Sequence, residues 1–305
     1  MNLLPYILFC ENPLEPAKVE PDFESEWLAA KPNGFTTLLF NFDDLISDDR
    51  LGVATKRIKQ MDEPATVIYR GWMLTPAQYR ILYYDLLNKN YKLINTVEEY
   101  QNCHYLPDSL QFIGHRTPVT VFEKVSSGDY FNTLLEKVKI FGNSPVIIKD
   151  YVKSEKHDWH TACFVTDASD TEQLKKTIDN FLHLRGQYLN EGIVIRAFEE
   201  LNGLTIHSKS GMPLTEEYRL FFLNKQLLAI YNYWEEGTYD LAKPDTKEFE
   251  ELAATIDSNF FSMDIARTKS DGFIIIELGD GQVAGLPDSA DKGDFYMRLK
   301  EAIDR

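Results

Sequence analysis

Two acidic residues, Asp264 and Glu277, occur in the neighbouring apolar stretches "FFSMDIARTKS" and "FIIIELGD". These stretches read as antiparallel strands joined by Asp271-Gly272, a dipeptide that favours a two-residue hairpin turn. With this turn Asp264 faces Gly279, and because side chains alternate along a strand it shares a face with Glu277. A turn one residue earlier puts Asp264 directly opposite Glu277, whereas a three-residue loop would separate them. The two favoured turns therefore predict two carboxylates close together on one face of a sheet.

Two carboxylates on one face repel each other unless a positive charge lies between them. Magnesium is bound by oxygen ligands, commonly one or two carboxylates together with nucleotide phosphates. Asp280 follows the second strand and could add a third oxygen, so we expect a metal site at Asp264, Glu277 and Asp280. The alternative is an exposed strand with scattered acids, and the flanking isoleucines argue against it.

Two basic residues lie in other apolar strands, Lys149 in "PVIIKD" and Arg219 in "EYRLFFL". A cation on a buried strand needs an anion, and a nucleotide phosphate is one candidate, which arginine suits through its two-pronged geometry. Lys153 shares a face with Lys149 if the strand continues. Two alternatives stay open: Lys149 could pair with Asp150 or a glutamate, and Arg219 could form an ordinary cross-strand ion pair.

The elements that must hold these residues follow from the hydrophobic pattern. The N-terminal part contains the short apolar strands "PYILFC", "TTLLFNF" and "ATVIYRGW" and the helix "TPAQYRILYYDLLNKN". Thr75 can cap this helix, and Pro76 suits its first position. Mixed strands and helices of this kind predict an α/β domain over residues 1–111.

Two further segments follow, which we assign as domains 112–191 and 192–305. The first contains "PVIIKD", a strand "TACFVTDA" and a helix that Asp170 or Thr171 can cap and Gly186 can end. The second contains the hairpin "EYRLFFLNKQLLAIYNYW", with its turn at Asn224-Lys225, and then the acidic hairpin.

Composition narrows the class of protein. The chain has 305 residues, enough for two or three domains, and its 44% hydrophobic and 26% charged residues exclude general disorder. A formal charge of −16 disfavours nucleic acid as a partner. The three cysteines form no CxxC pair, which indicates neither a structural zinc nor a disulfide framework. With no signal-peptide pattern and no apolar run of about 20 residues, we expect a cytoplasmic protein without a membrane span.

The order of these motifs resembles that of the ATP-grasp fold: a lysine on a strand, a hinge strand, an arginine on a strand, then a late aspartate and glutamate. The chain is similar to the ribosomal-protein glutamate ligases and, more narrowly, to a predicted amidoligase branch found in phages and bacteria. The stretches "YRGWMLTPAQY", "KDYVKSEKHDW" and "ELGDGQVAGLP" look like that branch, and the likeness covers roughly residues 65–290. It implies an α/β (α+β) fold in which an N-terminal domain precedes two subdomains that sandwich ATP.

The resemblance also implies roles for individual residues. Lys149 would contact a nucleotide phosphate, Arg219 the triphosphate, and Asp264 and Glu277 the metal. The hinge "IVIRAFEEL" would bind adenine through the backbone of Arg196, Ala197 and Phe198, and ribose through Glu199 or Glu200. In the first domain, Arg70 would hold a substrate carboxylate or the acyl phosphate, unless it is a structural arginine.

The sequence departs from the family pattern in two places. The usual asparagine two residues after the metal-binding glutamate is Gly279, and Asp280, one position later, is the expected substitute. The usual glycine-rich phosphate lid is replaced by "KSEKHDWH". A cationic lid would hold phosphate by charge, with Lys153 and Lys156 as candidates and His157 as a weaker one.

The implied activity is ATP-dependent ligation of a carboxylate to an amine through an acyl phosphate, with ATP and Mg²⁺ as cofactors. The substrates would be small molecules or peptides, no nucleic acid or membrane is expected, and the sequence leaves a homo-oligomer open. The alternatives are an ATP-dependent phosphotransferase and a non-catalytic ATP-binding or interaction protein. Nucleotidyl transfer from Lys149 is disfavoured, because "DYVK" follows it in place of the "x-D-G" of such enzymes.

Overall fold

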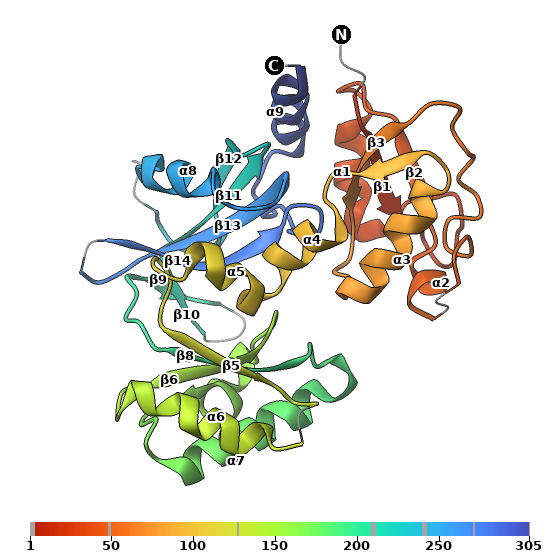
Figure 1. The fold of residues 1–305 in the computed structure, drawn as a ribbon. Coiled ribbons are helices and arrows are strands. Elements are labelled where there is room, and N and C mark those ends of the chain that lie inside the picture. The colour runs from red at the N-terminus through yellow and green to blue at the C-terminus, as the bar shows by residue number, and fades with distance from the viewer. Residues whose placement is uncertain are drawn as a thin grey trace.

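The computed structural model describes residues 4–47, 50–126, 128–208, 212–239, 243–270 and 272–304. Within these residues the strands form three four-stranded sheets and one two-stranded sheet. Figure 1 shows the three larger sheets as separate layers, each with its own helices. The mixed α/β architecture that the sequence predicts is confirmed.

The N-terminal sheet is parallel and has the order β2-β1-β3-β4. Parallel strands need crossover connections, and helices provide them here. The predicted helix cap is confirmed: Thr75 and Gln78 form a reciprocal capping box, and Pro76 is the first helical residue. The elements are β1 (Tyr6–Cys10), α1 (Glu24–Ala30), β2 (Thr37–Phe40), α2 (Phe42–Ser47), β3 (Ala65–Arg70), α3 (Pro76–Leu87) and β4 (Tyr91–Leu93).

The small sheet, of order β5-β8-β6-β7, is antiparallel and is covered on one face by α6 and α7. Asp170 caps α7 as expected, since its carboxylate accepts from the backbone of Glu172 and Gln173. The elements are β5 (Thr120–Lys124), α6 (Tyr130–Val138), β6 (Val146–Asp150), β7 (Phe164–Val165), α7 (Thr171–Arg185) and β8 (Gly192–Ala197). The other face carries Lys149 and Arg196, whose side chains reach β14 of the C-terminal sheet.

The C-terminal sheet is antiparallel with the order β12-β11-β13-β14. The predicted turn at Asn224-Lys225 is confirmed: both residues have positive φ, 47° and 68°, as a type I′ hairpin turn requires. The strands are β11 (Glu217–Leu223), β12 (Gln226–Asn232), β13 (Phe260–Arg267) and β14 (Phe273–Asp280), and the short hairpin β9 (Gly203–Ile206) and β10 (Pro213–Thr215) precedes them.

Helices from distant parts of the sequence cover the C-terminal sheet. Apolar residues of α4 (Val97–His104), α5 (Leu106–Ile113) and α8 (Lys247–Ala253) pack on one face. One end of the other face packs against α9 (Lys292–Asp304) and β1. Because α4 and most of α5 belong to the segment 1–111, packing crosses the boundary near residue 111, and the division into three domains stays a proposal.

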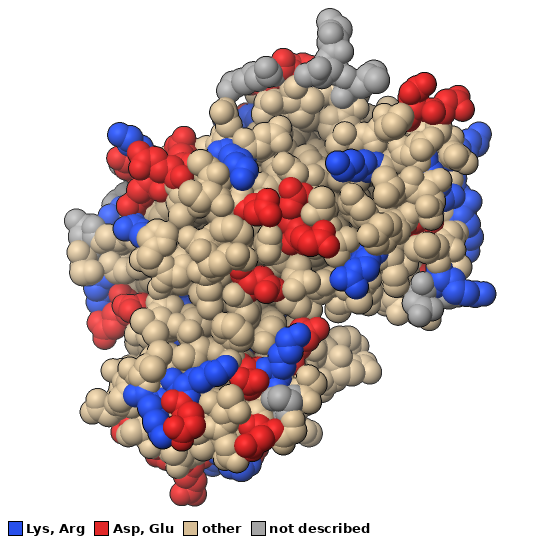
Figure 2. Space-filling model, in the orientation of Figure 1, with Lys and Arg blue, Asp and Glu red and all other residues tan. Residues whose placement is uncertain are grey.

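The surface and the helices bear on possible partners. On the face shown in Figure 2, acidic and basic side chains are interspersed, without a broad basic surface for nucleic acid. None of the helices among the described residues combines the length and apolarity needed to cross a membrane.

Candidate active site

Asp264 and Glu277 are direct cross-strand partners on β13 and β14. The expected turn was wrong in detail, and one of its residues, Asp271, lies outside the described residues. The hairpin closes with a backbone hydrogen bond from Thr268 to Gly272, a register that by itself would not align the two acids. A β-bulge at Ile276 compensates, because Ile265 pairs with Ile275 while Asp264 pairs with Glu277.

Arg219 on β11 is the second cross-strand neighbour of Asp264. Its Nε lies 2.8 Å from Asp264 Oδ1 and its Nη2 lies 2.7 Å from Oδ2, a two-pronged ion pair. Asp264 is only 3% exposed, so this pair compensates a buried charge. The cross-strand ion pair, one of the two interpretations of Arg219, is therefore present.

Lys149 reaches Glu277 from the small sheet, with 2.8 Å between Nζ and Oε2. Burial raises the pKa of Glu277, but the ammonium of Lys149 overrides it, and the pKa falls to about 2. The expected pairing with a glutamate thus joins the two sheets. Lys149, Glu277, Asp264 and Arg219 together form one alternating row of charges between the sheets.

Asp280 does not belong to this row, which corrects the expectation of a third metal ligand. β14 extends through Asp280, so alternation turns its side chain away from Glu277. The carboxylate is fully buried and accepts hydrogen bonds from Asn95 Nδ2 at 2.6 Å and from Gln282. Burial raises its pKa to about 7. Gly279 offers no substitute, since an added Cβ would lie 2.7 Å from Ser262 Oγ.

Two carboxylates therefore remain for a divalent cation. Among the described residues no group of three acidic, histidine or cysteine side chains is arranged to hold a metal. Asp264 and Glu277 fit magnesium, which commonly takes one or two protein carboxylates and completes its shell with phosphates and water.

Arg70 is a structural arginine, contrary to its expected substrate role. It is 2% exposed and forms a two-pronged pair with Glu26, with both N···O distances at 2.9 Å. Its Nη1 donates to the carbonyls of Gly281 and Ala284. With these donors engaged inside the protein, Arg70 fixes the loop after β14 to the N-terminal sheet.

The hinge segment also differs from the expectation. The N–H groups of Ala197 and Phe198 donate to the carbonyls of Val119 and Pro145, so neither is available to an adenine base. The Arg196 side chain is buried and donates to the carbonyls of Ile275 and Ile276, at the bulge of β14.

The remaining hinge residues border an aromatic cluster. The Phe198 ring packs on Phe164, with 5.1 Å between centroids, and Phe164 stacks on Trp159. Glu199 and Glu200 are both exposed, and Glu200 pairs with Lys269 at 3.0 Å. Glu199 stays the proposed ribose contact, and the rings offer an apolar surface for a base.

The segment that replaces the lid lies between the two sheets. Lys156 Nζ is 5.7 Å from the ring centroid of Trp234, which follows β12, so the segment reaches across to the C-terminal sheet. Lys153, Lys156 and His157 are exposed. Their contact with phosphate stays a proposal.

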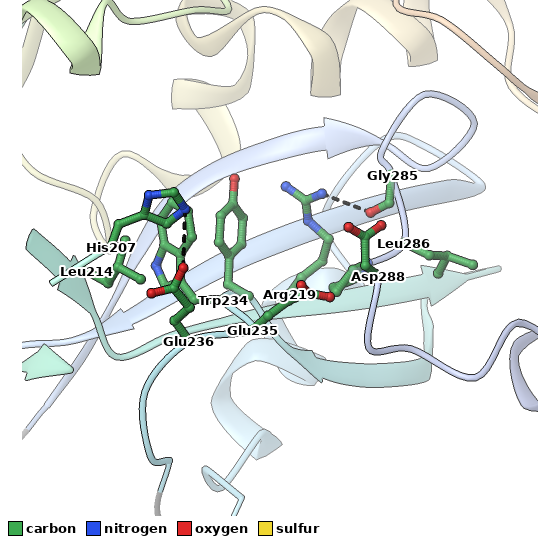
Figure 3. A pocket seen from close by; sticks show the side chains of 11 residues that line it. His207, Leu214, Arg219, Trp234, Glu235, Glu236, Gly285, Leu286 and Asp288 are labelled. Atoms are coloured by element: carbon green, nitrogen blue, oxygen red, sulfur yellow. Dashed lines mark hydrogen bonds and ion pairs between the residues drawn. The ribbon is translucent and has the colours of Figure 1, made fainter. Parts of the chain in front are cut away.

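A pocket of about 340 Å³ adjoins the charged row at Arg219. Figure 3 shows the His207 and Glu236 pair at one end of it and Arg219, Gly285 and Asp288 at the other. The sequence interpretation missed this pocket, although "YWEE" at the end of the β12 hairpin combines aromatic and acidic residues in a recognisable signal. The lining residues are His207, Leu214, Arg219, Tyr233, Trp234, Glu235, Glu236, Gly285, Leu286, Pro287 and Asp288.

Two sheets that face each other across a row of phosphate-binding and metal-binding side chains define the ATP-grasp class of folds. A family described as an ATP-grasp domain, the third family of its clade, matches residues 139–299, and the chain belongs to this family. A comparison with curated proteins finds no match.

Solved structures support the same fold. A RimK-domain ATP-grasp protein from Sphaerobacter thermophilus is 12% identical, with 98% of each chain covered and a TM-score of 0.58. The ATP-grasp ligase PsnB, complexed with a variant of its minimal precursor, Mg and ADP, is 11% identical over 100% of both chains, with a TM-score of 0.56. D-alanyl-alanine synthetase A from Vibrio cholerae is 10% identical, with 99% of each chain covered and a TM-score of 0.52.

Proposed function

We propose that the protein is an ATP-dependent carboxylate–amine ligase that works through an acyl phosphate and uses Mg²⁺. The observation that carries the proposal is the alternating row Lys149, Glu277, Asp264 and Arg219 between two facing sheets. Membership in an ATP-grasp family and a fold shared with the ligase PsnB support it. The reaction would take place in the cytoplasm.

The first step is phosphoryl transfer. A substrate carboxylate oxygen attacks the γ-phosphorus of ATP, the bond to the β-phosphate oxygen breaks, and ADP leaves. Bound magnesium would bridge phosphate oxygens and neutralise part of their charge. Asp264 and Glu277 would hold that ion, while Lys149 and Arg219 donate to phosphate oxygens, with Lys153 and Lys156 adding charge from the lid segment.

The second step is aminolysis. The amine, after losing a proton to solvent, attacks the carbonyl carbon of the acyl phosphate. A C–N bond forms, the bond between that carbon and the phosphate oxygen breaks, and phosphate leaves. Such a sequence needs positioned charges and the exclusion of water, and it needs no protein nucleophile.

The test measures products with pooled carboxylates and pooled amines. A ligase releases ADP and phosphate and yields an amide that mass spectrometry detects. The double variant Asp264→Asn, Glu277→Gln should lose ATP turnover while its circular dichroism spectrum and melting temperature match a folded protein. Full activity in that variant would overturn the site assignment.

Two other outcomes identify the alternatives. ADP release with a phosphorylated product and no free phosphate would show a phosphotransferase. Absence of Mg-ATP binding by calorimetry would indicate an interaction protein without ATP chemistry.

A further inference from the structure

The pocket beside Arg219 has a strongly acidic lining. Three carboxylates line it, from Glu235, Glu236 and Asp288, against two basic side chains, His207 and Arg219. Its volume of about 340 Å³ lies within the range of small-molecule sites. Since Arg219 also forms one end of the charged row, a ligand here would lie next to the site of phosphoryl transfer.

The basic residues of the pocket are already matched by acids or carbonyls. Arg219 is paired with Asp264 through both prongs, and its Nη1 donates to the Gly285 carbonyl at 3.0 Å. His207 Nε2 lies 3.6 Å from Glu236, which also accepts from Ser208.

Glu235 and Asp288 keep uncompensated carboxylates. Among the residues that the structure describes, none donates a hydrogen bond to either carboxylate; only the Asp288 backbone carbonyl accepts, from Lys292. Both side chains are exposed to the pocket mouth and to solvent. The pocket therefore presents two unmatched negative charges beside a reaction centre that otherwise attracts anions.

Aromatic rings complete the wall. The Arg219 guanidinium lies 4.8 Å from the ring centroid of Tyr233, and Lys156 lies 5.7 Å from that of Trp234. These contacts show that the ring faces accommodate cations, as their quadrupoles favour. Lys156 itself is exposed, so its charge at the edge of the pocket is screened. Rings next to carboxylates suit an alkyl chain that ends in a cation.

The two substrates of the proposed ligase have opposite charges before reaction, and the pocket distinguishes them by sign. Unmatched carboxylates repel a substrate carboxylate or a phosphate and attract an ammonium. We infer that this pocket binds the amine substrate as an alkylammonium ion, with Glu235 and Asp288 as its counter-ions. The inference rests on the proposed ligase function for its meaning, but it is testable by binding alone.

The experiment titrates the full chain with cadaverine, with N-acetyl-lysine methylamide, and with glutarate as an anion of similar length, in the presence and absence of Mg-AMPPNP. Calorimetry should show binding of an ammonium probe and none of glutarate. The variant Glu235→Gln, Asp288→Asn should raise the Kd of the ammonium probe about tenfold or more, as expected for lost charged hydrogen bonds. Preference for cadaverine or for the lysine derivative tells a free amine from a peptide side chain.

A matched control separates local from overall charge. Glu251→Gln with Asp257→Asn removes the same two charges from exposed positions in and after α8, and it should leave the Kd unchanged. An equal loss in the control, binding of glutarate, or no ammonium binding by the wild-type chain would overturn the inference. If the double variant fails to fold, Glu235→Gln alone should weaken binding. Loss of Mg-AMPPNP binding with ammonium binding intact would instead contradict the ligase proposal.

Discussion

Asp264 and Glu277 face each other across two antiparallel strands, and each is held by a cation from a different direction. Arg219 approaches Asp264 within the C-terminal sheet, whereas Lys149 approaches Glu277 from the small sheet. The acid pair is thus also the point at which the two sheets are joined. Changes at this point should affect both nucleotide chemistry and the fit between the sheets.

Replacing Lys149 tests the side of the pair contributed by the small sheet. In Lys149→Met, Glu277 loses its ammonium partner and the triphosphate loses a donor, so we expect ADP release to fall about a hundredfold. Lys149→Arg keeps the charge and should retain more activity. Steady-state ADP release is the measurement, and unchanged turnover in Lys149→Met would exclude Lys149 from the site.

Replacing Arg70 should affect stability far more than nucleotide binding. Arg70→Met leaves the Glu26 carboxylate buried without a partner, which should lower the free energy of unfolding by about 3 kcal/mol. Adding Glu26→Gln should recover part of this loss in a double-mutant cycle. Urea denaturation measures it, and the Kd of Mg-AMPPNP serves as the control. A stable variant that binds substrate poorly would restore the original substrate role.

Asp280 should make stability depend on pH in the neutral range. Its pKa rises from 3.8 to about 7 in the folded state, so between these values the folded protein binds more protons than the unfolded chain. This contribution stabilises the protein at low pH and is lost as pH rises toward 7. Asp280→Asn should therefore flatten the curve of unfolding free energy against pH between about pH 4 and 7. Parallel curves for the two proteins would contradict the assignment.

Arg196 should act as a positioning residue for the acid pair. Its guanidinium donates to the carbonyls of Ile275 and Ile276, at the bulge that brings Glu277 opposite Asp264. Arg196→Met should loosen this register, raising the Mg²⁺ concentration needed for half-maximal turnover about tenfold, roughly the effect of losing a charged hydrogen bond. Arg196→Lys should be intermediate. A variant that is merely less stable, with unchanged Mg²⁺ dependence, would argue for a purely structural role.

Local chemistry explains which predictions from the sequence were confirmed. Thr75 and Pro76 start a helix, and Asn224-Lys225 forms a turn, through contacts within a few residues. The grouping of Asp264 with Glu277 was also predicted, although the bulge at Ile276, which places them in register, has no signal in "FIIIELGD".

The residues that were misassigned depend on partners far along the chain. Arg70 is matched by Glu26 and by carbonyls of the loop after β14, and Asp280 is matched by Asn95, which lies just after β4. No periodicity or turn rule connects such positions, because only the packed structure brings them together. The same holds for the pocket, whose walls come from separate stretches of sequence.

The packing of α9 on α1 has a consequence for the order in which the protein can fold during synthesis. Ile7 and Phe9, on one face of the sheet at β1, share a core with Phe295 and Leu299 of α9, and the two ends of the chain lie near each other in Figure 1. The ribosome makes α9 after every other described element. The first sheet must therefore wait with an apolar face uncovered until translation reaches α9, which makes the nascent N-terminal segment a natural client for chaperones.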